Sequence, residues 1–208
     1  MNRLEPNSFK NLNEYIVANP YRVDIAVKSL QAAFKNNLTW LEKSFPRAVR
    51  RVKKIESGNN VIDRIFPAIR TQDGNDEADL MELDNESAYS FFYQPDTETS
   101  IDFEEFSNFN VYEVPLRAIF WMNLNFIDPD RGDDFLPELT TEVLKVILNT
   151  VYEDVDGTYV RGVEINDIYQ EPQNIFDGFS FNLVDTQFLH YPNRGLRVDM
   201  TVTISETC

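Results

Sequence analysis

Cysteine and histidine are nearly absent from this sequence, and their scarcity limits the chemistry open to the chain. Cys208 is the only cysteine and His190 the only histidine. One cysteine allows neither an intrachain disulfide nor a zinc site of cysteine ligands, and such use of cysteine fits synthesis in a reducing compartment. A single histidine leaves little material for acid–base or nucleophilic catalysis. Since no Gly-x-Ser-x-Gly element accompanies His190, we expect an ordinary loop histidine and no catalytic residue.

Glycine is also scarce, and long apolar runs are missing. The chain has seven glycines and contains neither a Walker loop nor a dinucleotide fingerprint, so we expect no bound cofactor. No stretch of eighteen apolar residues occurs, and residues 1–6 lack the apolar segment of a signal peptide. We therefore expect neither a membrane span nor entry into a secretory route.

Basic residues are unevenly distributed. None occurs between Arg70 and Arg117, an interval that holds thirteen carboxylates, and the whole chain has a formal charge of −16. Repulsion from phosphates then argues against general or sequence-specific binding of nucleic acid. A compact basic cluster precedes this interval, made of Arg47, Arg50, Arg51, Lys53 and Lys54. Such separation suits a contact in which the negative surface of one copy meets the positive surface of the next.

Two interpretations of this charge pattern remain open. In the first, the two charged segments meet between subunits, and the contact candidates are the five basic residues together with Asp73, Asp76, Glu77 and Asp79. In the second, an acidic loop and a basic helix face are simply solvated.

Two carboxylate-rich turns could supply oxygen ligands to a hard cation. They are the segment 128–134, with Asp128, Asp130, Asp133 and Asp134, and the run Asp154-Val155-Asp156-Gly157. Neither matches the twelve-residue calcium loop, and aspartate and glycine are common in tight turns. We therefore predict turns and no metal site, and a metal-dependent hydrolase is the weakest of the functional alternatives.

Hydrophobic periodicity predicts two main helices. Apolar residues recur at helical spacing from Val23 to Phe34, with an end near Asn36 and Asn37, and again over residues 136–151 with Pro137 in the first turn. The segment 39–45 is predicted to be a short helix or turn.

Six segments are predicted to be strands. They are 61–69, with Pro67 expected at a sheet edge; 87–93; the part of 111–127 beyond Pro115, expected to be central; 159–168; 179–188; and, as a sixth and the most regular, the alternating run 195–204. The expected fold is a single α+β domain over residues 1–208, with a mixed, mainly antiparallel sheet and two or three helices packed on it. Residues 1–20 are expected to be an N-terminal arm and 71–86 a long, exposed acidic loop without core residues.

The order of these elements and the sequence of the C-terminal segment form a recognisable pattern. The aromatic strand 87–93 and the central strand are followed by a helix, by Thr186-Gln187-Phe188-Leu189, by Tyr191-Pro192-Asn193-Arg194-Gly195, and by the alternating run to Ile204. This resembles the small tail-terminator and neck-ring subunits of tailed bacteriophages and prophages, in particular those of gut Bacteroidetes. The segments 72–85 and 102–105 are longer than a minimal terminator needs.

The resemblance implies a structural virion protein, made in the host cytoplasm, without enzymatic activity. Its subunits would form a ring of six or twelve copies in the neck or tail and join the capsid or portal side to tail proteins. An acidic lining would let DNA pass without sticking. The alternative is an intracellular acidic adaptor that binds a basic protein partner through residues 73–105.

Overall fold

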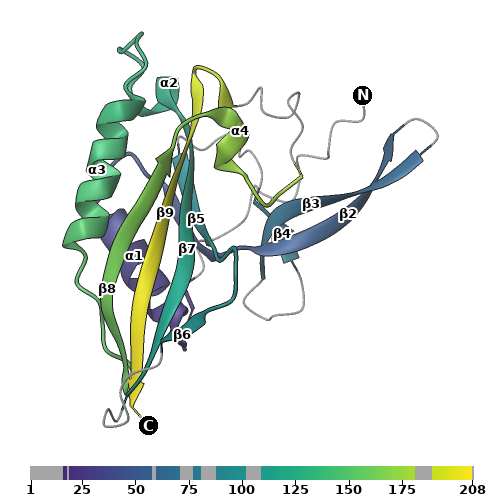
Figure 1. Ribbon diagram of the computed structural model, residues 1–208. Coiled ribbons are helices and arrows are strands. Elements are labelled where there is room, and N and C mark those ends of the chain that lie inside the picture. Colours follow the sequence, from purple (N-terminus) through teal and green to yellow (C-terminus); the bar gives the residue numbers. More distant parts are fainter. Residues whose placement is uncertain are drawn as a thin grey trace.

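The fold is α+β and is built on a mainly antiparallel sheet (Figure 1). The computed structural model describes residues 16–17, 19–57, 60–70, 77–80, 88–101, 109–180 and 189–207. Within these ranges the main sheet has the strand order β1-β5-β7-β9-β8, and β6 also pairs with β7. Its strands are β1 (Lys43–Arg47), β5 (Ala88–Tyr93), β6 (Thr99–Ile101), β7 (Phe109–Asn123), β8 (Thr158–Tyr169) and β9 (Asn193–Thr207). Among the described strand pairs of this sheet, only β1–β5 is parallel.

Two helices cover one face of this sheet. They are α1 (Val23–Asn37) and α3 (Leu136–Asn149), and their periodic apolar residues point into the larger of two hydrophobic clusters. Phe34 of α1 lies between two sheet residues, with ring centroids 5.8 Å from Phe92 and 5.2 Å from Phe120. The even-numbered residues 114–122 of β7 and 196–204 of β9 supply the sheet side of this core. The predicted alternation of the last strand is therefore confirmed, because these residues share one face.

The described residues cover the opposite face of the sheet only in part. The short helix α4 (Pro172–Ile175) and the segment after it pack on aromatic residues of β5 and β7, where the rings of Tyr89 and Trp121 lie 5.6 Å apart. Gly195 allows this close approach, since a Cβ at that position would lie 2.9 Å from side-chain carbons of Ile175. Figure 1 looks onto this face, with α4 near the upper ends of the strands and α1 behind them.

A buried ionic network joins the α4 segment to the sheet. Arg197 alternates with apolar residues along β9, yet only 4% of its surface is exposed. Its Nε lies 2.8 Å from Asp199, it donates to the backbone carbonyl of Asn174, and its guanidinium stacks 4.0 Å from the ring of Tyr169. Arg117 of β7 lies 3.5 Å from the same Asp199. Beyond this network, Thr201 and Thr203 on the same face of β9 are half-buried.

A second, three-stranded sheet leaves the body of the protein. It contains β2 (Val49–Ser57), β3 (Asn60–Arg70) and β4 (Glu77–Asp79), paired in the order β2-β3-β4. The β2–β3 pair projects sideways, away from α3, as a long ribbon (Figure 1). Only the three residues at the end of β3 nearest the body also pair with β4. We call residues 49–57 and 60–70 the β-arm.

Several local predictions are wrong. Segment 39–45 was predicted to be a short helix or turn: residues 39–40 do form a turn, but the part from Lys43 belongs to strand β1 and the segment contains no helix. The basic cluster continues into β2 and is not a helix face, because it pairs residue by residue with β3. Pro67 is not on an edge: the end of β3 that contains it is the part with a strand on each side, and its carbonyl accepts from the N–H of Leu80 at 2.8 Å.

Three other boundaries differ from the predictions. The central strand β7 already begins at Phe109 and includes Pro115, which is tolerated because β6 has ended and β5 has not yet begun opposite it. Helix α3 ends at Asn149, and Val151 beyond it is 89% exposed, so it does not belong to the apolar stripe. The predicted strand 179–188 is irregular at 179–180 and otherwise lies outside the described residues.

The predicted acidic loop is interrupted. Residues 77–79 form β4, and both Asp79 and Leu80 are buried, so the expectation that 71–86 holds no core residue is wrong. The remaining residues of this segment lie outside the described part of the chain, as do 1–15 and 18 of the predicted N-terminal arm. Among the described helices, none combines the length and apolar character needed to cross a bilayer.

Candidate functional site

The β-arm carries three exposed residues of β2 on one of its two sides. Alternate residues of β2 share a face, so Arg50, Val52 and Lys54 point to the same side, and all three are exposed. Val61 of β3 adds a second apolar side chain on this side, and the exposed fractions of Val52 and Val61 are 59% and 62%. Neither Arg50 nor Lys54 forms an ion pair with a described residue. A two-stranded ribbon is at best marginally stable in water, so such a surface is suited to packing on another molecule.

The other side of the β-arm is tied to the chain's own β4. Asp79 is 6% exposed and accepts from Arg51 at 3.3 Å and from Lys53. The ammonium of Lys53 also lies 5.5 Å from the centre of the Phe66 ring. A buried carboxylate needs such partners, because its desolvation would otherwise be unfavourable. These contacts hold the base of the β-arm to the three-stranded sheet.

Arg47 has a structural role at the junction of β1 and α1. Its Nε and one terminal nitrogen donate to the carboxylate of Asp24 at 2.6 and 2.9 Å, and its other terminal nitrogen donates to Gln94 at 2.6 Å. This bidentate geometry fixes the start of the helix against the sheet.

The structure therefore divides the predicted contact residues into three groups. Arg47, Arg51, Lys53 and Asp79 have partners within the chain, whereas Arg50 and Lys54 are available to a neighbour. Glu77 lies on β4, and Asp73 and Asp76 lie outside the described residues. The odd and even positions of the cluster differ because a strand directs successive side chains to opposite faces. The sequence pattern did not predict a strand here, so it could not separate the two sets of residues.

An acidic surface that the sequence did not predict lies on the uncovered part of the main sheet. Glu113 of β7 is paired in register with Thr203 of β9, and Glu164 of β8 with Thr201. The side chains of Glu113, Glu164 and Asp167 are exposed, and none of them is ion-paired with a described residue. These residues are far apart in sequence, and only the order β7-β9-β8 brings them onto one face. We call this surface, together with Thr201 and Thr203, the open sheet face.

Two of the carboxylates that were considered as cation ligands, Asp133 and Asp134, are ion-paired with arginines. Arg194 lies 2.7 Å from Asp134, and Arg131 binds both Asp133 and Glu138, at 2.8 and 2.6 Å. The hydrogen bonds from Arg131 hold the pKa of Asp133 and that of Glu138 below their usual values, and the pKa of Arg131 is raised by the same bonds. Within the described ranges no group of three or more histidine, cysteine or acidic side chains is placed to bind a metal ion.

The single histidine lies in the turn before β9. His190 is exposed, and its backbone carbonyl accepts from the N–H of Asn193 at 2.8 Å. Cys208 lies outside the described residues.

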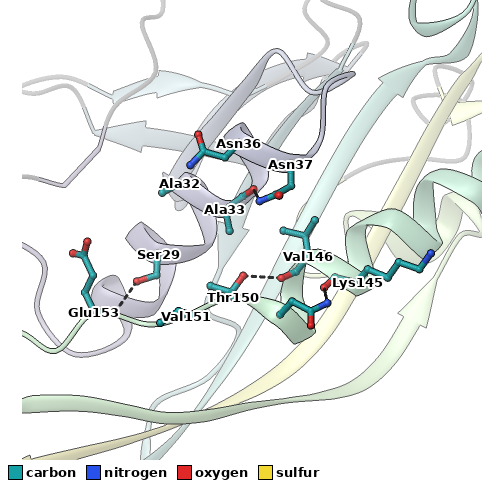
Figure 2. A pocket seen from close by; sticks show the side chains of 11 residues that line it. Ser29, Ala32, Ala33, Asn36, Asn37, Lys145, Val146, Thr150, Val151 and Glu153 are labelled. Atoms are coloured by element: carbon teal, nitrogen blue, oxygen red, sulfur yellow. Dashed lines mark hydrogen bonds between the residues drawn. The ribbon is translucent and has the colours of Figure 1, made fainter.

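A hollow of about 440 Å³ separates α1 from the end of α3 (Figure 2). Two small residues, Ala32 and Ala33, line it on the α1 side. Its polar groups are largely engaged: Asn37 donates to the carbonyl of Ala33 at 2.8 Å, and Thr150 donates to that of Val146 at 2.7 Å. These side chains complete the ends of their own helices, so we assign no ligand to the hollow.

Comparison with models of known protein families and with the sequences of characterised proteins finds no match to this chain.

Proposed function

We propose that this protein is a structural virion subunit that assembles into a ring in the neck or tail of a tailed phage or prophage. The observation that carries the proposal is the β-arm, a projecting ribbon with free positive charges and exposed valines. Residues 49–57 and 60–70 have a net charge of +4 in a chain of net charge −16, so the rest of the chain carries −20. A positive projection on a negative body favours contact between unlike surfaces of neighbouring subunits.

The geometry of the β-arm supports a head-to-tail contact. A contact between two different surfaces leaves one copy of each surface unused, so assembly continues until the chain of subunits closes into a ring or grows as a filament. The order of elements that resembles the phage neck and tail proteins favours the closed ring. In this arrangement the protein would join capsid or portal proteins to tail proteins without binding DNA, because the body is strongly acidic.

The test is the native mass of the purified protein over a concentration series, measured by light scattering after size exclusion, with electron microscopy of any large species. We expect a closed ring of six or twelve copies. Terminase, portal or tail genes beside its gene would agree with this. A chain that remains a monomer at every concentration would instead favour the acidic adaptor.

A further inference from the structure

The β-arm and the open sheet face have complementary charges at matching distances. Arg50 and Lys54 are four residues apart on one strand, which separates them by about 13 Å. Glu113 of β7 and Glu164 of β8 lie on the two strands that flank β9. The β9 residues in register with them, Thr203 and Thr201, are two positions apart. Strand spacings of about 4.8 Å across the sheet and about 3.4 Å per residue place these two glutamates roughly 12 Å apart.

The positions between the charges also match. On the β-arm, Val52 lies halfway between Arg50 and Lys54 and is exposed. On the open sheet face, Thr201 and Thr203 of β9 lie between the two glutamates and are half-buried. Threonine methyl groups on a sheet form a flat surface on which a valine can pack.

We infer that the exposed side of the β-arm binds the open sheet face of a second copy of this chain. Arg50 and Lys54 pair with Glu113 and Glu164 of the neighbour, and Val52 packs on the two threonines between them. This inference rests on the proposed function and names the two surfaces that form the ring contact. The two patches differ, so a head-to-tail contact propagates from one copy to the next, whereas two copies that exchange β-arms reciprocally would form only a dimer.

The experiment exchanges the charges of the two surfaces. One variant carries Arg50→Glu and Lys54→Glu, and the other carries Glu113→Lys and Glu164→Lys. We expect each variant alone to associate about a hundred-fold more weakly than the wild-type chain, because like charges then face each other. An equal mixture of the two variants should regain association, since each β-arm again meets an open sheet face of opposite charge. A chain with all four substitutions should regain it as well.

The matched control reverses two basic residues on the helical side, with Lys28→Glu and Lys145→Glu. It changes the net charge by as much as the β-arm variant does and should leave association unchanged. Circular dichroism checks that each variant is folded. Rings that tolerate both charge reversals would overturn the inference and leave the proposed function intact. A wild-type chain that stays monomeric up to about 1 mM, where binding is very weak, would overturn both.

Cross-linking gives a second, independent measurement. Two chains, each also carrying Cys208→Ser, have one new cysteine, at Val52→Cys in one chain and at Thr203→Cys in the other. A disulfide requires Cα atoms within about 7 Å, so it forms only where the two positions meet. We expect a cross-linked dimer of unlike chains when the two are mixed and oxidised. Its absence under conditions where the wild-type chain forms rings would show that the β-arm binds elsewhere.

Discussion

Replacing Arg197 by methionine tests whether the buried ionic network holds the α4 segment on the sheet. Methionine keeps an unbranched side chain in place of the aliphatic part of arginine and removes the guanidinium. The variant therefore loses the 2.8 Å contact with Asp199, the bond to the carbonyl of Asn174 and the stacking on Tyr169. Asp199 keeps Arg117 at 3.5 Å as its remaining cationic partner.

The expected loss of stability depends on the charge of Asp199, which the substitution leaves with a weaker set of partners. Removing one partner of a buried ion pair costs about 3–5 kcal/mol when the other charge is left uncompensated. Arg117 still compensates Asp199 in part, which favours the lower end, while loss of the cation–π contact adds about 1 kcal/mol. We expect the free energy of unfolding to fall by about 4 kcal/mol. For a chain of this length that corresponds to a melting temperature lower by roughly 8–16 °C.

The assay is urea unfolding, followed by tryptophan fluorescence and by circular dichroism. Trp121 lies in the core next to α4, so its emission reports on this region. Arg50→Met is the matched control, since it removes an exposed guanidinium without an ion pair, and its free energy of unfolding should stay within about 0.5 kcal/mol of wild type. An equally small change for Arg197→Met would refute the reasoning, because the network would then contribute nothing beyond the packing of its aliphatic carbons.

Three other predictions concern stability and ionisation. Burial raises the pKa of Tyr152 to about 12. Its contribution to stability is therefore complete below the pKa of about 10 that tyrosine has in the unfolded chain, and it is lost as the pH rises from there to the pKa in the folded chain. Tyr152→Phe should remove this loss, which is measured as the difference between the urea midpoints at pH 8 and pH 11. Arg131→Ala should raise the pKa of Asp133 toward its ordinary value in a carboxyl NMR titration, whereas an unchanged titration would contradict the hydrogen bond between them. Gly195→Ala should lower the free energy of unfolding by about 1–3 kcal/mol, because its Cβ would lie 2.9 Å from a side chain of α4, while Gly162→Ala, with no atom within 4 Å, should not.

The spacing of apolar residues predicted those helices and strands that have one apolar and one polar face. Helix α1 and strand β9 have regular apolar positions that pack on one core, so their spacing alone indicated both their type and their buried face. Arg197 shows the limit of this reasoning. A charged residue that alternates with apolar ones along a strand is typical of a face in contact with water. Here α4 and the segment after it cover that end of the face, and the pattern within one strand carries no information about such a cover.

The β-arm shows a second limit. Both sides of its outer part are exposed, so β2 lacks the alternation of apolar and polar residues that identifies a strand with one buried face. Charges follow one another through Arg50, Arg51, Lys53 and Lys54, which is compatible with an exposed helix or an exposed strand. Pairing with β3 decides between the two, and that pairing depends on residues 60–70 rather than on the cluster itself.

Strand geometry gives this one basic cluster two separate roles. Arg51 and Lys53 point to the side of Asp79, and substituting them would leave a buried carboxylate without its partners, so their loss acts on the stability of the β-arm. Arg50 and Lys54 point to the opposite side and have no described partner, so changes there can alter binding without affecting folding. The proposed ring contact depends on this separation, because charges already paired within one chain are not available to the next. The period of two along β2 provides it within five consecutive residues.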